Sequence, residues 1–557
     1  MLERVESEIQ KINKLVESNQ LPAALDLVDQ GIKTYPDETH FLKVRADISL
    51  QLGRPKDAIA ALERSVSLDP IANGYFLLAS AKLHTGDLQG ALRDFQHAME
   101  KSPEWYEGWE VYSRALFYNN DISQAEKAFE KAKSIQRATA MAHWEKQVEV
   151  QMGPRKFRRL KKYKLVRAAA KLLGGFPPVY RDQRYLGRVW WGWLGNSGHL
   201  DTLVKARKLG WTDRVRYTAI VDNQAQVGND EYLSLWSKFI KIETHPTNIA
   251  KSYLQGGHLF EPLHSTSLNG VSMPIYKAAA LVQREWERKN KKPLVGFSRK
   301  EKQRGWEILT REMNFPKNVK VVCLHVRDNG FWDTTGDKTN FSRSSDINSY
   351  DKCINFLLDK GYHVVRMGDS TMPKLNNQHP RLYDYATSSA KSKFMDIFLI
   401  SISEFLVCTN SSLYWVAVSL GIPTVMTNWL PIGVVPLQKR DIILYKHVYS
   451  DVEKRFLTAS EICQSPLKYI WSTNYLERNS LTVQENTSDD LKDACQEMVE
   501  GLRSRSIDVD PQQGKFAKVL EDNGLIFNGR VSRNFIGRNR NLFCEGAANA
   551  GRANKKR

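Results

Sequence analysis

Cysteine is scarce in this chain of 557 residues, and its placement excludes the zinc-finger class. The six cysteines are scattered, with no CxxC spacing and no histidine at finger distance: Cys323, Cys353, Cys408, Cys463, Cys495 and Cys544. We expect these thiols to be reduced and buried, as they are in proteins of the cytosol.

Long hydrophobic runs are also missing. The longest candidate, residues 414–426, is interrupted by Ser419, Gly421 and Pro423. It therefore falls short of the ~18–20 apolar residues that span a bilayer. The first residues carry acids where a secretory signal would need basic residues followed by an apolar stretch. We expect a cytoplasmic protein.

The composition is that of a globular protein with a basic excess. Hydrophobic residues make up 42% and charged residues 26%, which excludes disordered and collagen-like chains. At about 150 residues per domain, the length favours three or four units. Lys and Arg number 81 against 62 Asp and Glu, so the formal net charge is +19. Such a surface favours phosphate, nucleic acid, anionic lipid or an anionic substrate.

The first 150 residues contain an internal repeat. Asn19, Ala24, Val28 and Pro36 recur as Gly53, Ala58, Leu62 and Pro70, then as Gly86, Ala91, Phe95 and Pro103, and in part as Asn120, Ala125 and Phe129. Gly or Asn suits a turn between two helices, Ala lets helices approach closely, and Pro ends each unit. The pattern resembles the tetratricopeptide repeat over residues 5–150. It predicts an all-α solenoid that binds a protein partner or self-associates, or one that packs against the rest of the chain.

Residues 151–180 form a basic linker, with nine Lys or Arg and no acid. Apolar residues interleave with the basic ones at roughly helical spacing. Three interpretations stay open: an amphipathic helix on anionic lipid, a solvated helix between domains, and a nucleic-acid contact. The last is the least supported, because no RNA or DNA motif accompanies the segment. We therefore expect no nucleic-acid partner.

From about residue 181, short β-rich runs alternate with helical stretches, which predicts parallel sheets in two halves, 181–315 and 316–500. In the first half we expect strands at 187–194, 215–221 and 239–242. A glycine loop follows the first of them and would bring backbone amides and His199 towards a ligand. This acceptor-side loop comprises Gly195, Asn196, Gly198 and His199.

In the second half, three apolar strands end abruptly in polar residues. They are residues 319–327, ending in His325, Arg327 and Asp328; 362–369, ending in Arg366, Gly368 and Asp369; and 405–412, ending in Asn410, Ser411 and Ser412. Ligands bind at the carboxyl ends of such strands in doubly wound folds. An arginine there suits a diphosphate, and the serines open a helix at 413–420 that suits phosphate.

These stretches carry a family resemblance over about residues 185–545. CLHVRDNGFWD, SRSSDINSY and LLDKGYHVVRMGDS, within 323–370, resemble a family of bacterial glycosyltransferases, as do GNSGHLD at 195–201 and GRVSRNF at 529–535. HVR at 325–327 and MDIFLISISEFLVCTNSS at 395–412 are similar to the donor half of α-1,6- and protein O-fucosyltransferases. The resemblance implies a GT-B fold: two facing Rossmann-like domains that bind a nucleotide-sugar without a metal.

The resemblance also implies residue roles. His325 would contact the nucleotide, Arg327 the pyrophosphate and Asp396 the base, while Ser411 or Ser412 would hold the phosphates. The full expected donor set is His325, Arg327, Arg366, Gly368, Asp369, Asp396, Asn410, Ser411 and Ser412. After HVR, the residues DNGFWD at 328–333 replace the arginine and aspartate usual in the fucosyltransferases. The sugar and base therefore stay open, with a GDP-sugar slightly favoured.

The expected reaction moves a hexosyl or deoxyhexosyl group from a nucleotide-diphosphate sugar to a hydroxyl of a glycan or glycolipid acceptor, with inversion, in surface glycan synthesis. Arg327, with help from Arg366, would stabilise the leaving diphosphate. His199 and Asp328 are the candidate bases, with Asp333 third. No metal is implied, because the single DxD, at 508–510, fits chance. The alternative is a repeat scaffold whose α/β part binds nucleotide without turnover.

The basic excess is unevenly placed. Residues 1–150 carry 18 basic and 23 acidic residues, whereas the tail at 501–557 is basic. Charge therefore gathers in the linker and the tail that flank the expected enzyme. We expect the tail to pack in part on the enzyme. If the linker lies on anionic lipid, the protein would lie peripherally on the inner face of the cytoplasmic membrane.

Overall fold

The computed structural model describes residues 2–18, 20–155, 157–158, 183–212, 215–255, 259–330, 338–375, 377–504 and 511–544. Most of the basic linker, Asp333 and the DxD at 508–510 lie outside these residues. Among the described residues, no helix is both long and apolar enough to cross a membrane.

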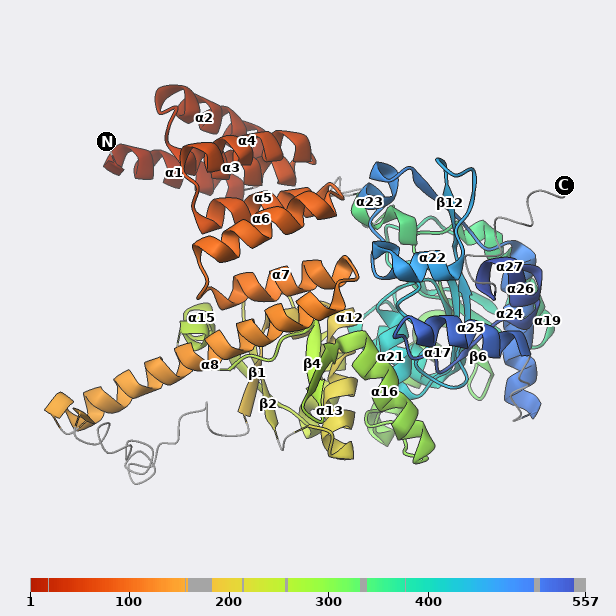
Figure 1. Cartoon of the computed structure of the whole chain (residues 1–557). Coiled ribbons are helices and arrows are strands. Elements are labelled where there is room, and N and C mark those ends of the chain that lie inside the picture. Colours follow the sequence, from red (N-terminus) through yellow and green to blue (C-terminus); the bar gives the residue numbers. More distant parts are fainter. Residues whose placement is uncertain are drawn as a thin grey trace.

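The N-terminal region is an array of antiparallel helix pairs (Figure 1). Its helices are α1 (Leu2–Glu17), α2 (Leu21–Thr34), α3 (Thr39–Gln51), α4 (Pro55–Leu68), α5 (Ala72–His84), α6 (Leu88–Lys101), α7 (Tyr106–Tyr118) and α8 (Ile122–Met152). The repeated Ala24, Ala58 and Ala91 are fully buried between helices. Gly53 and Gly86 take left-handed φ angles of 69° and 78° in the turns, which glycine adopts without strain. The predicted all-helical array is confirmed.

A small parallel sheet follows, in the order β1-β2-β3, accompanied by a hairpin. Its elements are β1 (Gln183–Leu186), α11 (Arg188–Trp191), α12 (Leu194–Ser197), α13 (Leu200–Leu209), β2 (Arg216–Asp222), α14 (Asp230–Leu235), η2 (Trp236–Lys238), β3 (Lys241–His245), α15 (Thr247–Gln255), β4 (Ser265–Leu268), β5 (Val271–Pro274), α16 (Ile275–Arg288) and α17 (Arg299–Met313). We call this part the small-sheet unit.

The strand expected at 187–194 is wrong. The strand is β1, and the chain then turns into α11 and α12. Trp190 and Trp191 are consecutive and both buried, which one helical turn against the core allows. The expected glycine loop is likewise a helical turn. A Cβ on Gly198 would lie 2.2 Å from the Cβ of Trp415, so the glycine permits close packing there.

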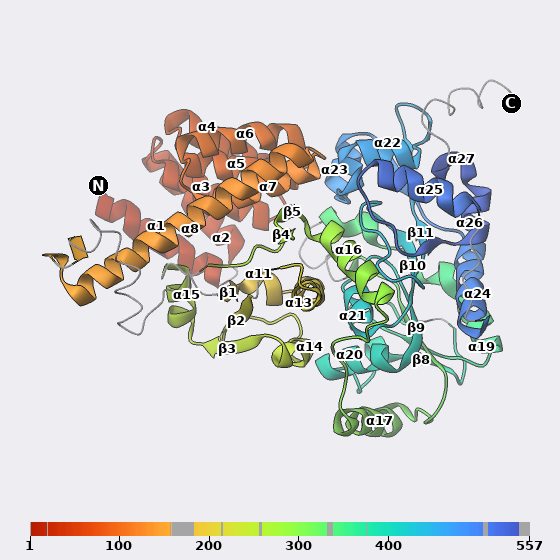
Figure 2. The ribbon, with the colours of Figure 1, turned by 60° about the horizontal axis from the view of Figure 1, so that its bottom comes forward.

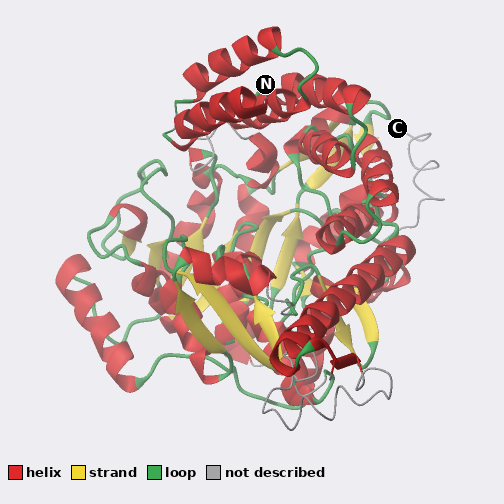
Figure 3. Ribbon diagram, turned by 90° about the vertical axis from the view of Figure 1, so that its left-hand side faces the viewer, coloured by secondary structure: helices red, strands yellow, loops and turns green. Residues whose placement is uncertain are grey.

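A seven-stranded parallel sheet forms the centre of the second half, in the order β15-β11-β10-β9-β6-β7-β8. Its strands are β6 (Val321–His325), β7 (His363–Arg366), β8 (Leu382–Asp384), β9 (Ser403–Cys408), β10 (Thr424–Trp429), β11 (Ile442–Tyr445) and β15 (Arg530–Val531). Figure 3 shows the strands in the middle, with helices around them. The chain after residue 511 thus supplies an edge strand of this sheet.

The remaining elements cover or extend the large sheet. They are η3 (Lys338–Arg343), η4 (Ile347–Tyr350), α19 (Asp351–Asp359), η5 (Tyr385–Thr387), α20 (Lys393–Ile402), α21 (Leu413–Leu420), β12 (His447–Ser450), β13 (Arg455–Phe456), α22 (Ala459–Gln464), η6 (Pro466–Lys468), α23 (Thr473–Arg478), β14 (Leu481–Gln484), α24 (Ser488–Ser504), α25 (Pro511–Asp522), α26 (Arg533–Arg538) and α27 (Arg540–Phe543). Strands β13-β12-β14 form a separate antiparallel sheet.

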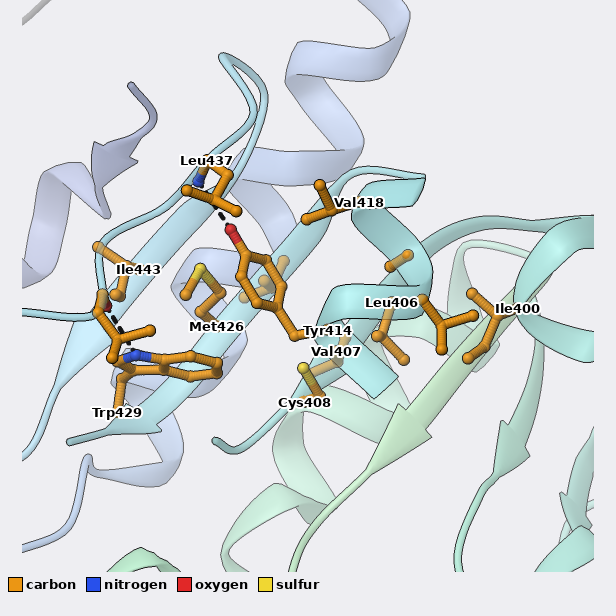
Figure 4. Packing of buried hydrophobic residues seen from close by; sticks show 14 of the residues in the cluster. Ile400, Leu406, Val407, Cys408, Tyr414, Val418, Met426, Trp429, Leu437 and Ile443 are labelled. Carbon is orange, nitrogen blue, oxygen red and sulfur yellow. Dashed lines mark hydrogen bonds between the residues drawn. The ribbon is translucent and has the colours of Figure 1, made fainter. Parts of the chain in front are cut away.

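The core of the second half is continuous and apolar. Figure 4 shows Tyr414 of α21 and Trp429 of β10 packed among aliphatic side chains, and both are at most 1% exposed. Each aromatic side chain donates its one polar hydrogen: Trp429 Nε1 to the carbonyl oxygen of Val434 at 2.9 Å, and the Tyr414 hydroxyl to Asp441. All six cysteines are free; five are buried, and Cys544 is partly exposed.

The last helices of the array pack against the rest of the chain (Figure 2). The rings of Phe117 and Tyr469 lie 4.0 Å apart. Arg114 Nη1 lies 3.1 Å from His264 Nε2 in the small-sheet unit. The array therefore contacts both α/β parts, while α1 to α4 extend away from them (Figure 1).

Candidate functional site

A cavity lies at the point of the large sheet where the strand order reverses, beside β6. Strands β7 and β8 add to one side of β6, and β9, β10, β11 and β15 add to the other. Ligands of open parallel sheets bind at the carboxyl ends of the strands at such a switch point. The cavity measures about 580 Å³ and lies between the small-sheet unit and the large sheet. We call it the cleft.

Both α/β parts line the cleft. The small-sheet unit contributes Arg188, Gly192, Trp193, Leu194, Gln226 and Gly228; the large-sheet part contributes His325, Arg327, Asp328, Asn340, Arg343, Met367, Gly368, Asp369, Met372, Lys391, Asp396, Ser411, Ser412 and Leu413. Residues from the ends of all three predicted strands therefore meet here.

Two arginines give the cleft its basic wall. Arg327 follows β6, where its backbone N–H donates to Thr409 Oγ1 at 2.9 Å. Arg343 ends η3 and donates to two neutral oxygens, Asn340 Oδ1 at 3.1 Å and the carbonyl of Asn410 at 2.8 Å. Burial and the nearby Arg327 lower the pKa of Arg343 to about 9. Burial also lowers the pKa of Arg327. Because each cation is disfavoured here, an anion bound between them would be stabilised.

The N-terminus of α21 adds two serines to the same wall. Ser411 and Ser412 line the cleft directly ahead of the helix. A Cβ on Gly195 would lie 3.0 Å from Ser412 Oγ, so the small-sheet unit approaches α21 closely at this point. Helix N-termini favour phosphate because their first N–H groups lack partners within the helix. Asn410 instead donates its side-chain amide to the carbonyl of Leu430, while its own backbone carbonyl accepts a hydrogen bond from Arg343. It therefore holds Arg343 in place.

Three further predicted residues line the cleft with perturbed pKa values. Burial, with help from Arg327, lowers the pKa of His325 to about 4, so this imidazole is neutral at pH 7. Burial raises the pKa of Asp328, which accepts a hydrogen bond from the Gly330 backbone at 3.2 Å. Burial also raises the pKa of Asp396, although its ion pair with Lys391 opposes the shift.

The structure does not bring His199 into the cleft. His199 is 4% exposed, and its ring lies 4.1 Å from the ring of Trp415 and 5.5 Å from that of Tyr276. Burial lowers its pKa to about 3. Asn196 of the same segment donates its amide to the carbonyl of Val189. Packing thus accounts for these residues, and Gly195 contributes only the close approach to Ser412.

Arg366 is also withdrawn from the cleft. It is 1% exposed, its Nη1 lies 3.0 Å from Asp384 Oδ1, and its Nη2 donates to the carbonyl of Pro373 at 2.9 Å. The side chain therefore ties β7 to β8 rather than facing a ligand. Its neighbour Asp369, by contrast, lines the cleft.

The burial of His199 predicts a pH effect on stability. Its folded pKa, about 3, lies below the unfolded value near 6.5, so the unfolded chain binds a proton first as the pH falls. Between pH 7 and pH 5 the wild type should lose about 2 kcal/mol relative to His199→Phe. Urea unfolding of both proteins at the two pH values measures this difference. An unchanged difference would mean that the ring is solvated.

Several residues that line the cleft were not predicted from the sequence: Arg188, Trp193, Asn340, Arg343 and Lys391. Trp193 is 61% exposed, which is unusual for so large an apolar ring. The signal for Arg343 was present, because it lies in the SRSSDINSY stretch. Among the described residues, no group of three or more His, Cys, Asp or Glu is arranged to hold a metal ion.

Comparison with known proteins identifies the array alone. A family model described as tetratricopeptide repeat matches residues 10–74 and 50–104. No curated protein matches the chain. The solved structures that resemble it include "Crystal structure of MamA protein" (20% identity over 31% of this chain and 96% of that one, TM-score 0.23). A second is "MamA 41-end from Desulfovibrio magneticus RS-1" (21% identity, 24% and 76%, TM-score 0.23).

A third similar structure is "First TPR of Spaghetti (RPAP3) bound to HSP90 peptide SRMEEVD", with 18% identity over 20% of this chain and 90% of that one, and a TM-score of 0.19. The identification of the repeats rests on the family model. The chain thus combines a tetratricopeptide repeat array with a mixed α/β part built on a seven-stranded parallel sheet.

Proposed function

We propose that the chain is a glycosyltransferase of GT-B architecture, with an acceptor-side domain at 181–315 and a donor domain at 316–500, to which β15 of the C-terminal tail adds an edge strand. It would transfer a sugar from a nucleotide-diphosphate sugar to a hydroxyl acceptor. One observation carries the proposal: Arg327 and Arg343 lie together with Ser411 and Ser412 in a cleft at the switch point of the large sheet. Two guanidinium groups and a helix N-terminus suit a diphosphate.

The proposed reaction is a displacement at the anomeric carbon of the donor sugar. The acceptor oxygen attacks the anomeric carbon, and the bond between that carbon and the β-phosphate oxygen breaks. The electron pair of that bond leaves with the nucleoside diphosphate, whose added charge Arg327 and Arg343 would stabilise. The neutral His325 would hydrogen-bond to the nucleotide, and Asp396 would hold the base.

The proton of the acceptor hydroxyl needs a base. Asp328 is the better candidate of the two expected, because it lines the cleft and burial raises its pKa. A carboxylate with a raised pKa takes a proton more readily near neutral pH. His199 lies outside the cleft lining, and Asp333 lies outside the described residues.

The acceptor would be a glycan or glycolipid, as in surface polysaccharide synthesis at the inner face of the cytoplasmic membrane. For the array we propose binding of a protein partner or of a second copy, because the matched repeat family builds concave helical surfaces. The same repeats favour one rival function, in which the chain is a scaffold whose α/β part binds nucleotide without turnover.

A panel of GDP-, UDP-, ADP- and CMP-sugars tests the proposal against the scaffold. We expect one donor to raise the melting temperature of the full chain and to release free nucleotide slowly, as water replaces the acceptor. Binding without release, even with hydroxyl acceptors added, would favour the scaffold. A panel with neither binding nor release would contradict both.

A further inference from the structure

The turn between α5 and α6 of the array contacts the α/β part at α23. The carbonyl of His84 accepts a hydrogen bond from Asn474 Nδ2 at 2.5 Å. Arg478 Nη2 lies 3.3 Å from Asp87 Oδ2. Gly86 lies against the backbone of α23, since a Cβ built on it would lie 2.6 Å from Tyr475 Cα. No side chain fits there unless α23 moves.

The same short helix holds η3, which carries Arg343. Asn474 Nδ2 also lies 3.3 Å from Thr339 Oγ1. The backbone N–H of Ser342 donates to Thr473 Oγ1 at 2.9 Å, and its hydroxyl donates to the carbonyl of Trp471. Helix α23 therefore fixes η3 from both ends.

Trp471, just ahead of α23, reaches the cleft arginine itself. Its Nε1 donates to Asn340 Oδ1 at 3.3 Å, and Asn340 in turn accepts from Arg343. The Arg343 guanidinium lies 5.3 Å from the centre of the Trp471 ring. A cavity of about 180 Å³, lined by Leu83, Leu88 and Trp471 among others, leaves space in this seam for α23 to shift.

We propose that the α5–α6 turn of the repeat array is a positioning element of the cleft, acting through α23 and η3 on Arg343. The proposal rests on the proposed function as far as the ligand is concerned, but the contacts themselves need no ligand. A displacement of α23 at Gly86 would release the Ser342 amide from Thr473 and shift the Arg343 guanidinium from its present place in the cleft wall. The array is then part of the binding machinery as well as a partner-binding surface.

Amide hydrogen exchange in the full chain, without ligand, tests the coupling. We compare Gly86→Ala with Gly53→Ala, which replaces the equivalent glycine one repeat earlier, with a similar left-handed φ. Both substitutions strain a turn of the array, but Gly53 lies between α3 and α4, farther out than α5 and α6 (Figure 1). We expect faster exchange over residues 338–343 in Gly86→Ala alone. Unchanged exchange, or an equal rise in both variants, would overturn the proposal.

Asn474→Ala provides a second variant if Gly86→Ala does not fold, because it removes the contacts with His84 and Thr339 without inserting an atom. We expect the same local increase in exchange, with a melting temperature close to that of the wild type. Slow exchange over 338–343 in Asn474→Ala would also overturn the coupling.

Affinity then links the coupling to the ligand. With GDP, UDP, ADP and CDP as probes, Gly86→Ala should weaken binding of whichever one the wild type binds by about three- to thirtyfold, and Gly53→Ala should not. If faster exchange in Gly86→Ala comes with unchanged affinity, the positioning role is refuted while nucleotide binding stands. If the wild type binds none of the four, the proposed function fails, and the exchange data still decide the coupling.

Discussion

Replacing Arg327 or Arg343 by alanine is expected to lower the affinity for a nucleoside diphosphate by about 10- to 100-fold each, and to reduce the rise in melting temperature that a fixed nucleotide concentration causes. Both guanidinium groups line the cleft, and burial disfavours the charged form of both, which lowers their pKa values. The bound anion therefore gains contacts that water cannot replace. Titration calorimetry of each variant with the nucleoside diphosphate that the wild type binds measures the loss.

Arg343→Lys and Arg366→Ala provide the controls. Lysine keeps the charge but cannot donate to Asn340 and Asn410 in the same fork, so its affinity should fall between those of wild type and Arg343→Ala. Arg366 is buried beside Asp384, away from the cleft, so its loss should lower stability more than affinity. If Arg343→Ala bound the nucleotide with the affinity of the wild type, the diphosphate site could not lie against Arg343.

Asp441→Leu is expected to destabilise the fold by about 3–5 kcal/mol. Asp441 is fully buried and accepts hydrogen bonds from the Thr424 and Gln438 backbone amides, at 2.9 and 3.1 Å, and from the Tyr414 hydroxyl at 3.0 Å. Leucine would leave all three donors without this acceptor. Figure 4 shows that the Tyr414 hydroxyl also accepts a hydrogen bond from the Leu437 backbone N–H. Tyr414 therefore anchors α21 to the segment around Leu437 and Asp441. Chemical unfolding curves measure the loss.

Asp441→Asn keeps the shape of the Asp441 side chain but removes its ability to ionise, so it isolates the effect of the charge on stability. Burial raises the pKa of Asp441 to about 7, above its unfolded value near 3.9. The stability contributed by this group is therefore present at low pH and lost as the pH rises towards 7. From pH 5 to pH 8 the wild type should lose about 3 kcal/mol relative to Asp441→Asn, which cannot titrate. A pH-independent difference would show that Asp441 titrates normally.

The predictions from sequence succeeded where local pattern decides the outcome. Apolar runs that end in His325, Asp369 and Ser411 mark strand ends, and in a parallel sheet such ends meet at one edge. The repeated Gly53 and Gly86 likewise mark turns through their backbone conformation alone.

Which of the candidate residues face the cleft depends on contacts between segments far apart in the sequence. His199 is a titratable side chain in a glycine-rich segment, which is typical of a site residue. The ring of Trp415, more than 200 positions away in the sequence, packs against it. Arg343 lies in a short 3-10 helix with no periodicity to mark it, and it faces the cleft only because Asn410 and Trp471 hold it there. Contacts made across such distances in the chain are invisible to a local pattern.

A crystal structure of the full chain soaked with the best-binding nucleoside diphosphate would show where the diphosphate binds. We expect the diphosphate to lie in the cleft, with its oxygens within hydrogen-bond distance of the Arg327 and Arg343 guanidinium groups and with the nucleotide base near Asp396. A diphosphate bound elsewhere, or a cleft that stays empty at saturating ligand, would contradict the proposed function.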